Sequence, residues 1–81
     1  MKESTRSNHE NKNIVGHKIK QLRLEKGLTQ QNLIDSLKED EIYLDQKSIS
    51  AIECGLRKVF DFELLALSKC LEVQIDEFFC D

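Results

Sequence analysis

The chain has no proline and no tryptophan, and only three of its 81 residues are glycine. Leu, Ile, Lys, Glu and Gln are plentiful instead, and this balance favours helix over strand. At this length there is room for one domain with a modest core, which excludes a two-domain enzyme or one with a large cleft. We therefore expect an all-α fold, a compact five-helix bundle.

Long hydrophobic runs are also missing. No apolar stretch approaches the roughly 20 residues that a membrane-spanning helix needs. The first 13 residues lack the apolar segment of a secretion signal. We expect a cytoplasmic protein with no membrane partner.

Cysteine is scarce and follows no motif. Cys54, Cys70 and Cys80 are odd in number, lie 16 and 10 residues apart, and include no Cys-x-x-Cys. The pattern suggests neither a disulfide framework nor a zinc site, so we expect no cofactor and no metal. A redox role for Cys54 stays a separate hypothesis.

The net charge is −3, whereas a protein that binds nucleic acid needs basic side chains to neutralise phosphates. The distribution of charge is uneven, however. Residues 14–60 carry eight basic and seven acidic side chains, whereas residues 61–81 carry one basic and six acidic ones. A binding surface in the middle of the chain, with the acidic end turned away, is physically consistent.

The order of the chain predicts one domain after a polar arm. Residues 1–13 contain no aliphatic side chain after Met1 and no helical period, so we expect a disordered N-terminal arm, with the domain over 14–81. In residues 14–26 the apolar positions Val15, Ile19 and Leu22 share one helical face, and Gly27 suits a helix end.

Four further helices are expected. Thr29 is a good N-cap for a second helix that fades near Lys38, and Asp45 for a third that ends at Gly55. Asp61 is expected to cap a fourth helix, and residues 74–79 to form a short fifth. The residues expected to face inward from the second and third helices are Leu33, Ile34, Leu37, Ile49, Ile52 and Leu56. The fourth helix, with Phe62, Leu64, Leu65, Leu67 and Leu71, is densely apolar and is therefore either central or buried in an interface. Ile75, Phe78 and Phe79 form the apolar side of the fifth.

Several short pieces of sequence occur in a fixed order along residues 14–79. They are Ile19-Lys20-Gln21-Leu22-Arg23, Glu25-Lys26-Gly27-Leu28-Thr29-Gln30, Leu33, Ser48-Ile49-Ser50-Ala51-Ile52-Glu53-Cys54-Gly55 with Arg57, Leu64-Leu65-Ala66-Leu67, Leu71-Glu72-Val73 and Ile75-Asp76-Glu77-Phe78. No single piece is specific. Together they resemble the Cro/C1-type helix-turn-helix regulators, also called the XRE family.

The resemblance implies a lambda-repressor-like DNA-binding domain whose second and third helices form the helix-turn-helix. The third helix would enter the major groove, where each base pair presents a distinct set of donors and acceptors. Its groove-facing side chains, opposite Ile49 and Ile52, would be Gln46, Lys47, Ser50 and Ala51. The alternative for Gln46 and Lys47 is an ordinary solvated helix surface.

Other positions take supporting roles in this resemblance. Gln30 resembles a glutamine that touches phosphate and steadies Gln46, while Arg23 and Glu53 resemble a structural ion pair between the first and third helices. Arg57 is expected to contact phosphate or else to be plainly solvated. The expected phosphate-contacting residues are Thr29, Gln30, Ser48, Arg57 and Lys58.

Three features depart from the family pattern. The connection between the second and third helices is longer than the usual turn and has no glycine. Ile34 stands where a small residue is usual. Glu39, Asp40 and Glu41 add negative charge that would repel DNA if they faced it.

The leading functional expectation is a sequence-specific DNA-binding transcriptional regulator, most simply a repressor, that binds a double-stranded operator as a homodimer through its fourth and fifth helices. There Phe62, Phe78 and Phe79 form either the dimer surface or ordinary core. The alternative is a protein-interaction module on the same fold, such as an antitoxin or an anti-repressor partner. An enzyme is not expected, because His9 and His17 have no nucleophile or carboxylate at a meaningful spacing.

Overall fold

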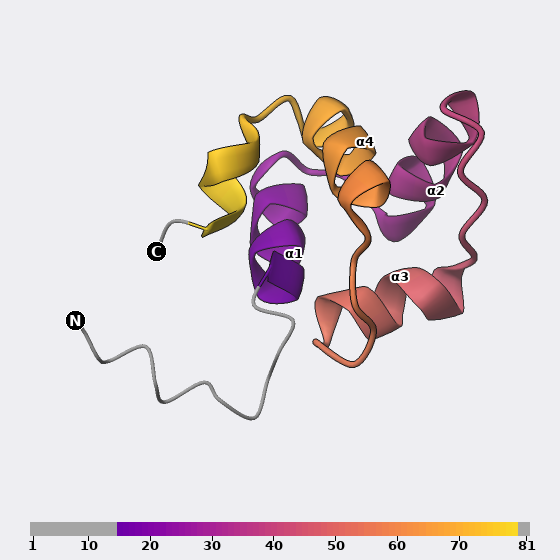
Figure 1. The fold of residues 1–81 in the computed structure, drawn as a ribbon, viewed down its shortest axis with the longest axis horizontal. Helices are drawn as coiled ribbons and strands as arrows, with labels where there is room; N and C mark the ends of the chain where they lie inside the picture. The colour runs from indigo at the N-terminus through magenta and orange to yellow at the C-terminus, as the bar shows by residue number, and fades with distance from the viewer. Residues whose placement is uncertain (1–14, 80–81) are drawn as a thin grey trace.

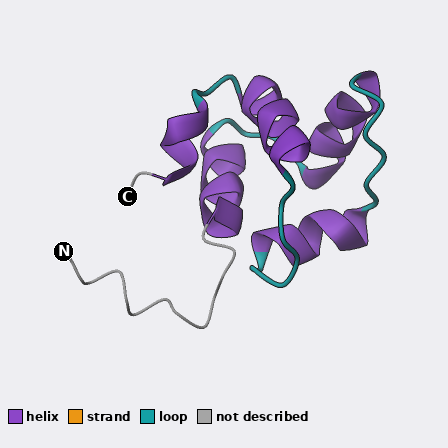
Figure 2. Cartoon of the chain, in the orientation of Figure 1, coloured by secondary structure: helices purple, strands orange, loops and turns teal. Residues whose placement is uncertain are grey.

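The computed structural model describes residues 15–79. It contains the α-helices α1 (Val15–Glu25), α2 (Gln30–Glu39), α3 (Gln46–Glu53) and α4 (Asp61–Leu71), followed by the 3-10 helix η2 (Ile75–Phe79), as Figure 1 shows. The described residues include no strand (Figure 2), which confirms the all-helical prediction. No helix between residues 15 and 79 has the length and apolar character needed to cross a membrane. The expected disordered arm over 1–13, Ile14 and Cys80 lie outside the described residues.

Local side-chain chemistry sets where α2 and α3 begin. The Thr29 hydroxyl accepts a hydrogen bond from the Asn32 amide at 3.0 Å, and the Asn32 side chain accepts one from the Thr29 amide at 2.8 Å. The Asp45 carboxylate accepts from the Ser48 amide at 2.8 Å, and this bond lowers the pKa of Asp45. The two predicted N-caps are therefore confirmed.

The predicted cap at Asp61 was wrong by one residue, because Phe60 is the N-cap of α4 and Asp61 is already helical. Phe60 has no side-chain oxygen with which to cap the first turn. Its own amide donates instead to the Glu63 carboxylate, at 3.0 Å. Only one of the two hydrogen bonds of a capping box is thus formed, the one accepted by the side chain of the third helical residue.

Each α-helix ends beside a residue with left-handed backbone. Gly27 and Gly55, the predicted terminators, have φ values of 71° and 82°. Glu41 and Glu72 occupy the same conformation after α2 and α4, with φ values of 63° and 59°. After α2 the Glu41 amide donates to the Lys38 carbonyl and the Ile42 amide donates to the Leu37 carbonyl, which is the Schellman arrangement. The connection between α2 and α3 therefore turns without glycine.

One hydrophobic core joins all five elements. α1 packs against α3, α4 and η2, and α2 packs against α3 and α4. The buried apolar side chains are Val15, Ile19, Leu22, Leu33, Ile34, Leu37, Ile49, Ile52, Ala66, Leu67, Leu71 and Phe78.

Several apolar residues of the predicted helices are exposed. Leu56 is 84% exposed, because it follows the chain reversal at Gly55 and the helical period no longer places it. Leu65 is half exposed, and in η2 only Phe78 is buried, whereas Ile75 and Phe79 face out. The fifth element is a tighter 3-10 helix, so an α-helical period did not apply to it.

Candidate nucleic-acid interface

The two faces of α3 differ sharply in burial. Ile49 and Ile52 are each 1% exposed and anchor the helix in the core. Gln46 and Lys47 are exposed in the first turn. Ser50 and Ala51, one turn later, are half-buried. The four residues predicted to read bases thus lie on one short helix whose opposite side is fixed by packing.

Hydrogen bonds from α2 hold the start of α3. The Gln46 amide nitrogen donates to the Gln30 side-chain oxygen at 3.1 Å, and the Ser50 hydroxyl donates to the same oxygen at 3.4 Å. The Gln30 amide nitrogen donates in turn to Glu53 Oε1 at 3.1 Å. The structure therefore brings together the predicted pair Gln30 and Gln46 and links both to the end of α3.

A buried ion pair continues this network into α1. Arg23 Nε lies 2.7 Å from Glu53 Oε2, and Arg23 Nη2 lies 3.0 Å from Glu53 Oε1. Arg23 Nη1 donates to the Leu28 carbonyl at 2.9 Å. Both residues are buried, and no buried side-chain nitrogen or oxygen among residues 15–79 lacks a hydrogen-bond partner. The pair fixes α3 relative to α1, although such a pair contributes more to geometry than to net stability.

The structure gives Arg57 a role that the sequence did not predict. Its two terminal nitrogens each donate to the Glu63 carboxylate at 3.0 Å, and the guanidinium lies 5.7 Å from the centre of the Phe60 ring. Hydrogen bonding to Glu63 raises the pKa of Arg57. Arg57 thus ties the loop after α3 to the first turn of α4.

Glu63 is a partner of Arg57 that the sequence did not predict. Burial alone would raise the pKa of its carboxyl group, but hydrogen bonds from Arg57 and from the Phe60 amide outweigh burial and lower it. The available signal was its place as the third residue of α4, from which glutamate commonly reaches back to the cap.

The predicted phosphate-contacting residues do not all remain available. Thr29 and Ser48 take part in the caps of α2 and α3, and Gln30 is engaged by Gln46, Ser50 and Glu53. Lys58 is exposed beside Arg57. Lys58 and Lys47, the latter on α3 itself, thus remain as exposed cations in this part of the molecule.

The acidic connection begins at the far end of α2. Asp40 and Glu41 follow the last turn of α2, whereas Gln30 opens it, and a helix of 10 residues is about 15 Å long. Ile42 packs against the core. Ile34, which departs from the family pattern, is accommodated in the core at 6% exposure.

Groups that could support other chemistry are sparse. Among residues 15–79 no cluster of three or more His, Cys, Asp or Glu side chains could hold a metal ion. Cys54 is exposed at the end of α3, whereas Cys70 is half-buried, and burial raises the pKa of its thiol. No known protein family, no curated protein and no solved structure matches this chain.

Proposed function

We propose that this protein is a sequence-specific DNA-binding transcriptional regulator, most simply a repressor, that reads the major groove with α3 as a homodimer. The observation that carries the proposal is the hydrogen bond between Gln30 and Gln46, at 3.1 Å. It orients an exposed amide side chain at the start of a helix whose other side is locked into the core.

The chemistry of the exposed side chains suits base recognition. A glutamine amide can pair bidentately with adenine, and a lysine can donate to guanine. The half-buried Ala51 offers a methyl group, which suits contact with thymine. One short helix reads few base pairs, so two copies with their α3 helices about 34 Å apart would read two half-sites one turn of DNA apart.

A protein-interaction module on the same fold is the second candidate. The acidic net charge of −3 and the exposed Asp40 and Glu41 favour it. Contacts to DNA phosphates release counterions. Only the DNA-binding function therefore predicts an affinity for DNA that falls steeply as the salt concentration rises.

The test is selection of bound sequences from a random pool of double-stranded DNA, followed by fluorescence anisotropy at about 50 and 200 mM salt. The selected sequence should bind at least about 1,000-fold more tightly than random DNA, and the higher salt should weaken binding at least about tenfold. No binding by the folded protein at the lower salt would overturn the proposal.

A matched pair of glutamine variants tests the assignment of base-reading residues. Gln46→Ala should relax choice at one base pair per half-site, a loss of about 1–3 kcal/mol of discrimination. Gln21→Ala removes an exposed glutamine of α1 that bonds only to Glu25 within the described residues, so it should leave the selected sequence unchanged. Equal effects of both variants on every sequence would show that α3 does not read the bases.

A further inference from the structure

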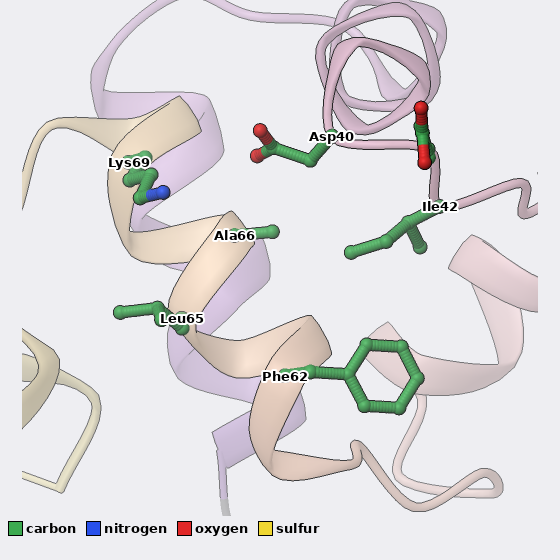
Figure 3. A pocket seen from close by; sticks show the side chains of 7 residues that line it. Asp40, Ile42, Phe62, Leu65, Ala66 and Lys69 are labelled. Atoms are coloured by element: carbon green, nitrogen blue, oxygen red, sulfur yellow. The ribbon is translucent and has the colours of Figure 1, made fainter.

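An open hollow of about 410 Å³ lies between α4 and the chain that follows α2 (Figure 3). On one side it is lined by a single face of α4, since its residues there are three, four and seven positions apart. On the other side it is lined by the start of the connection to α3. The lining residues are Asp40, Glu41, Ile42, Phe62, Leu65, Ala66 and Lys69.

Much of this face is apolar and open to solvent. Phe62 is 57% exposed and Leu65 is 49% exposed. The Phe62 ring stacks on the equally exposed ring of Phe60, with their centres 6.1 Å apart and their planes 1° from parallel. A contiguous exposed apolar patch with a polar rim is typical of an interaction site.

The charges on the rim have opposite signs on opposite sides. Asp40 and Glu41 belong to the connection, and Lys69 belongs to α4. Figure 3 shows the Asp40 carboxyl group and the Lys69 amino group facing each other at one end of the hollow, with Phe62 at the other end. None of these three charged groups forms an ion pair with another side chain in residues 15–79.

This arrangement is complementary to itself. A two-fold axis that runs along the hollow, parallel to α4, exchanges its two sides. Each Lys69 would then meet the Asp40 and Glu41 carboxylates of the second copy, and the two Phe62 rings would meet near the axis. A purely basic partner would be repelled by Lys69, and a purely acidic partner would be repelled by the Asp40 and Glu41 carboxylates. We infer that the occupant of this hollow is a second copy of the chain.

The inference rests on the proposed function, since it names the surface through which the two DNA-reading copies associate. It also differs from the dimer surface expected from the sequence, which included the fifth helix. Phe78 is core, at 2% exposure, and Phe79 lies on η2, away from the lining of the hollow. One face of α4, from Phe62 to Lys69, and the start of the connection after α2 form the interface instead.

Sedimentation equilibrium of the full chain without DNA tests the inference. The wild-type protein should dimerise at micromolar concentrations. Lys69→Glu should raise the dimer Kd about 100-fold, and the double variant Asp40→Lys/Glu41→Lys should do the same, because each sets like charges against one another at two places. An equimolar mixture of these two variants should dimerise about as tightly as the wild type, since both contacts become attractive in the mixed dimer.

Matched variants separate the hollow from other exposed positions. Phe62→Ser should abolish dimerisation, whereas Leu24→Ser removes an equally exposed apolar side chain from α1 and should not. Lys20→Glu is the corresponding control for Lys69→Glu. Circular dichroism of every variant checks that the helices are retained.

Three outcomes would overturn the inference. They are a wild-type protein that stays monomeric at millimolar concentration, a dimer indifferent to Phe62→Ser and Lys69→Glu, and a failure of the mixed variants to associate. Because no DNA is present, these outcomes leave the proposed function to be judged by its own titration. Conversely, a dimer that meets every expectation but binds no DNA would overturn the proposed function alone.

Discussion

Gln30 is the residue that fixes the first side chain of α3. Its amide nitrogen donates to Glu53 and its oxygen accepts from Gln46, both at 3.1 Å. A carboxylate can only accept, so Glu53 determines which way the Gln30 amide faces. That orientation presents the oxygen to Gln46. A side chain that can only accept cannot serve both neighbours, because the Glu53 carboxylate needs a donor.

Replacing Gln30 should therefore affect stability and sequence choice together. Gln30→Ala should lower the free energy of unfolding by about 1 kcal/mol, and Gln30→Glu should lower it further, because two carboxylates would then face each other. Under the proposed function, Gln30→Ala should also relax choice at the base pair read by Gln46. Urea unfolding and anisotropy with single-base operator variants measure the two effects.

Gln31 provides the control at the adjacent position. It is exposed and bonds to Asp35 within α2, so Gln31→Ala should change stability by no more than about 0.5 kcal/mol. It should leave sequence choice untouched. Equal losses of stability from Gln30→Ala and Gln31→Ala would contradict the positioning role of Gln30.

At the scale of the helices, the ends of α2 and α4 differ from those of α1 and α3. All four depend on a residue with positive φ, but only α1 and α3 use glycine there. A side chain in this conformation costs roughly 1–2 kcal/mol, because its Cβ crowds the backbone. The two glutamates, Glu41 and Glu72, therefore hold strain that glycine would relieve.

Glu72→Gly should stabilise the protein by about 0.5–1 kcal/mol. Position 72 is the better one to test, because Glu41 lies on the rim of the hollow and Glu72 does not. Glu72→Gln removes the charge but keeps the Cβ atom, so it should recover little of the gain. Equal free energies of unfolding for the glycine and glutamine variants would show that backbone strain at this helix end is negligible.

The elements that sequence predicted best are those with local determinants. Thr29 and Asp45 cap their helices with bonds to amides three residues away, and Gly27 and Gly55 follow the helices that they end. Such signals need no knowledge of tertiary structure. Phe60 was missed as a cap because its side chain has no oxygen, and the cap bond runs instead from the Phe60 amide to the Glu63 carboxylate.

The candidate site divides in the same way. The outward face of α3 was predictable from the spacing of Ile49 and Ile52. A helical period that places these two residues in the core also determines which residues face solvent. The contact between Arg57 and Glu63 closes a loop, and no period specifies it. The exposure of Phe62 also depends on packing, because α4 is apolar on more sides than the small core can cover.

For the whole molecule, charge is separated along the fold. Glu72, Asp76 and Glu77 lie in or just before η2, which packs on α1 and α4, while α3 lies at the other side of the molecule (Figure 1). Nearer α3, Glu63 is neutralised by Arg57. A net charge of −3 is therefore compatible with a neutral or basic surface around Lys47 and Lys58.

Glu63 should make the stability of the whole molecule depend on pH. Its pKa lies below the ordinary value, since its hydrogen bonds outweigh burial. A lowered pKa in the folded state stabilises the protein above the unfolded value of about 4.3, and this contribution disappears as pH falls through the folded value. Glu63→Gln should therefore cost about 1–2 kcal/mol at pH 7, and the difference from wild type should shrink as pH falls through the folded value.

Urea unfolding from pH 7 down to about pH 2 measures that difference directly. Asp45, whose pKa is also lowered, contributes to the acid sensitivity of both proteins and so cancels in the comparison. Glu72→Gln is the control, because Glu72 forms no ion pair with another side chain in residues 15–79 and its removal should shift the curve little at any pH. A difference between wild type and Glu63→Gln that stayed constant with pH would mean that ionisation of Glu63 does not stabilise the folded state. The bidentate bond to Arg57 would then not be the contact that holds the loop after α3 against α4.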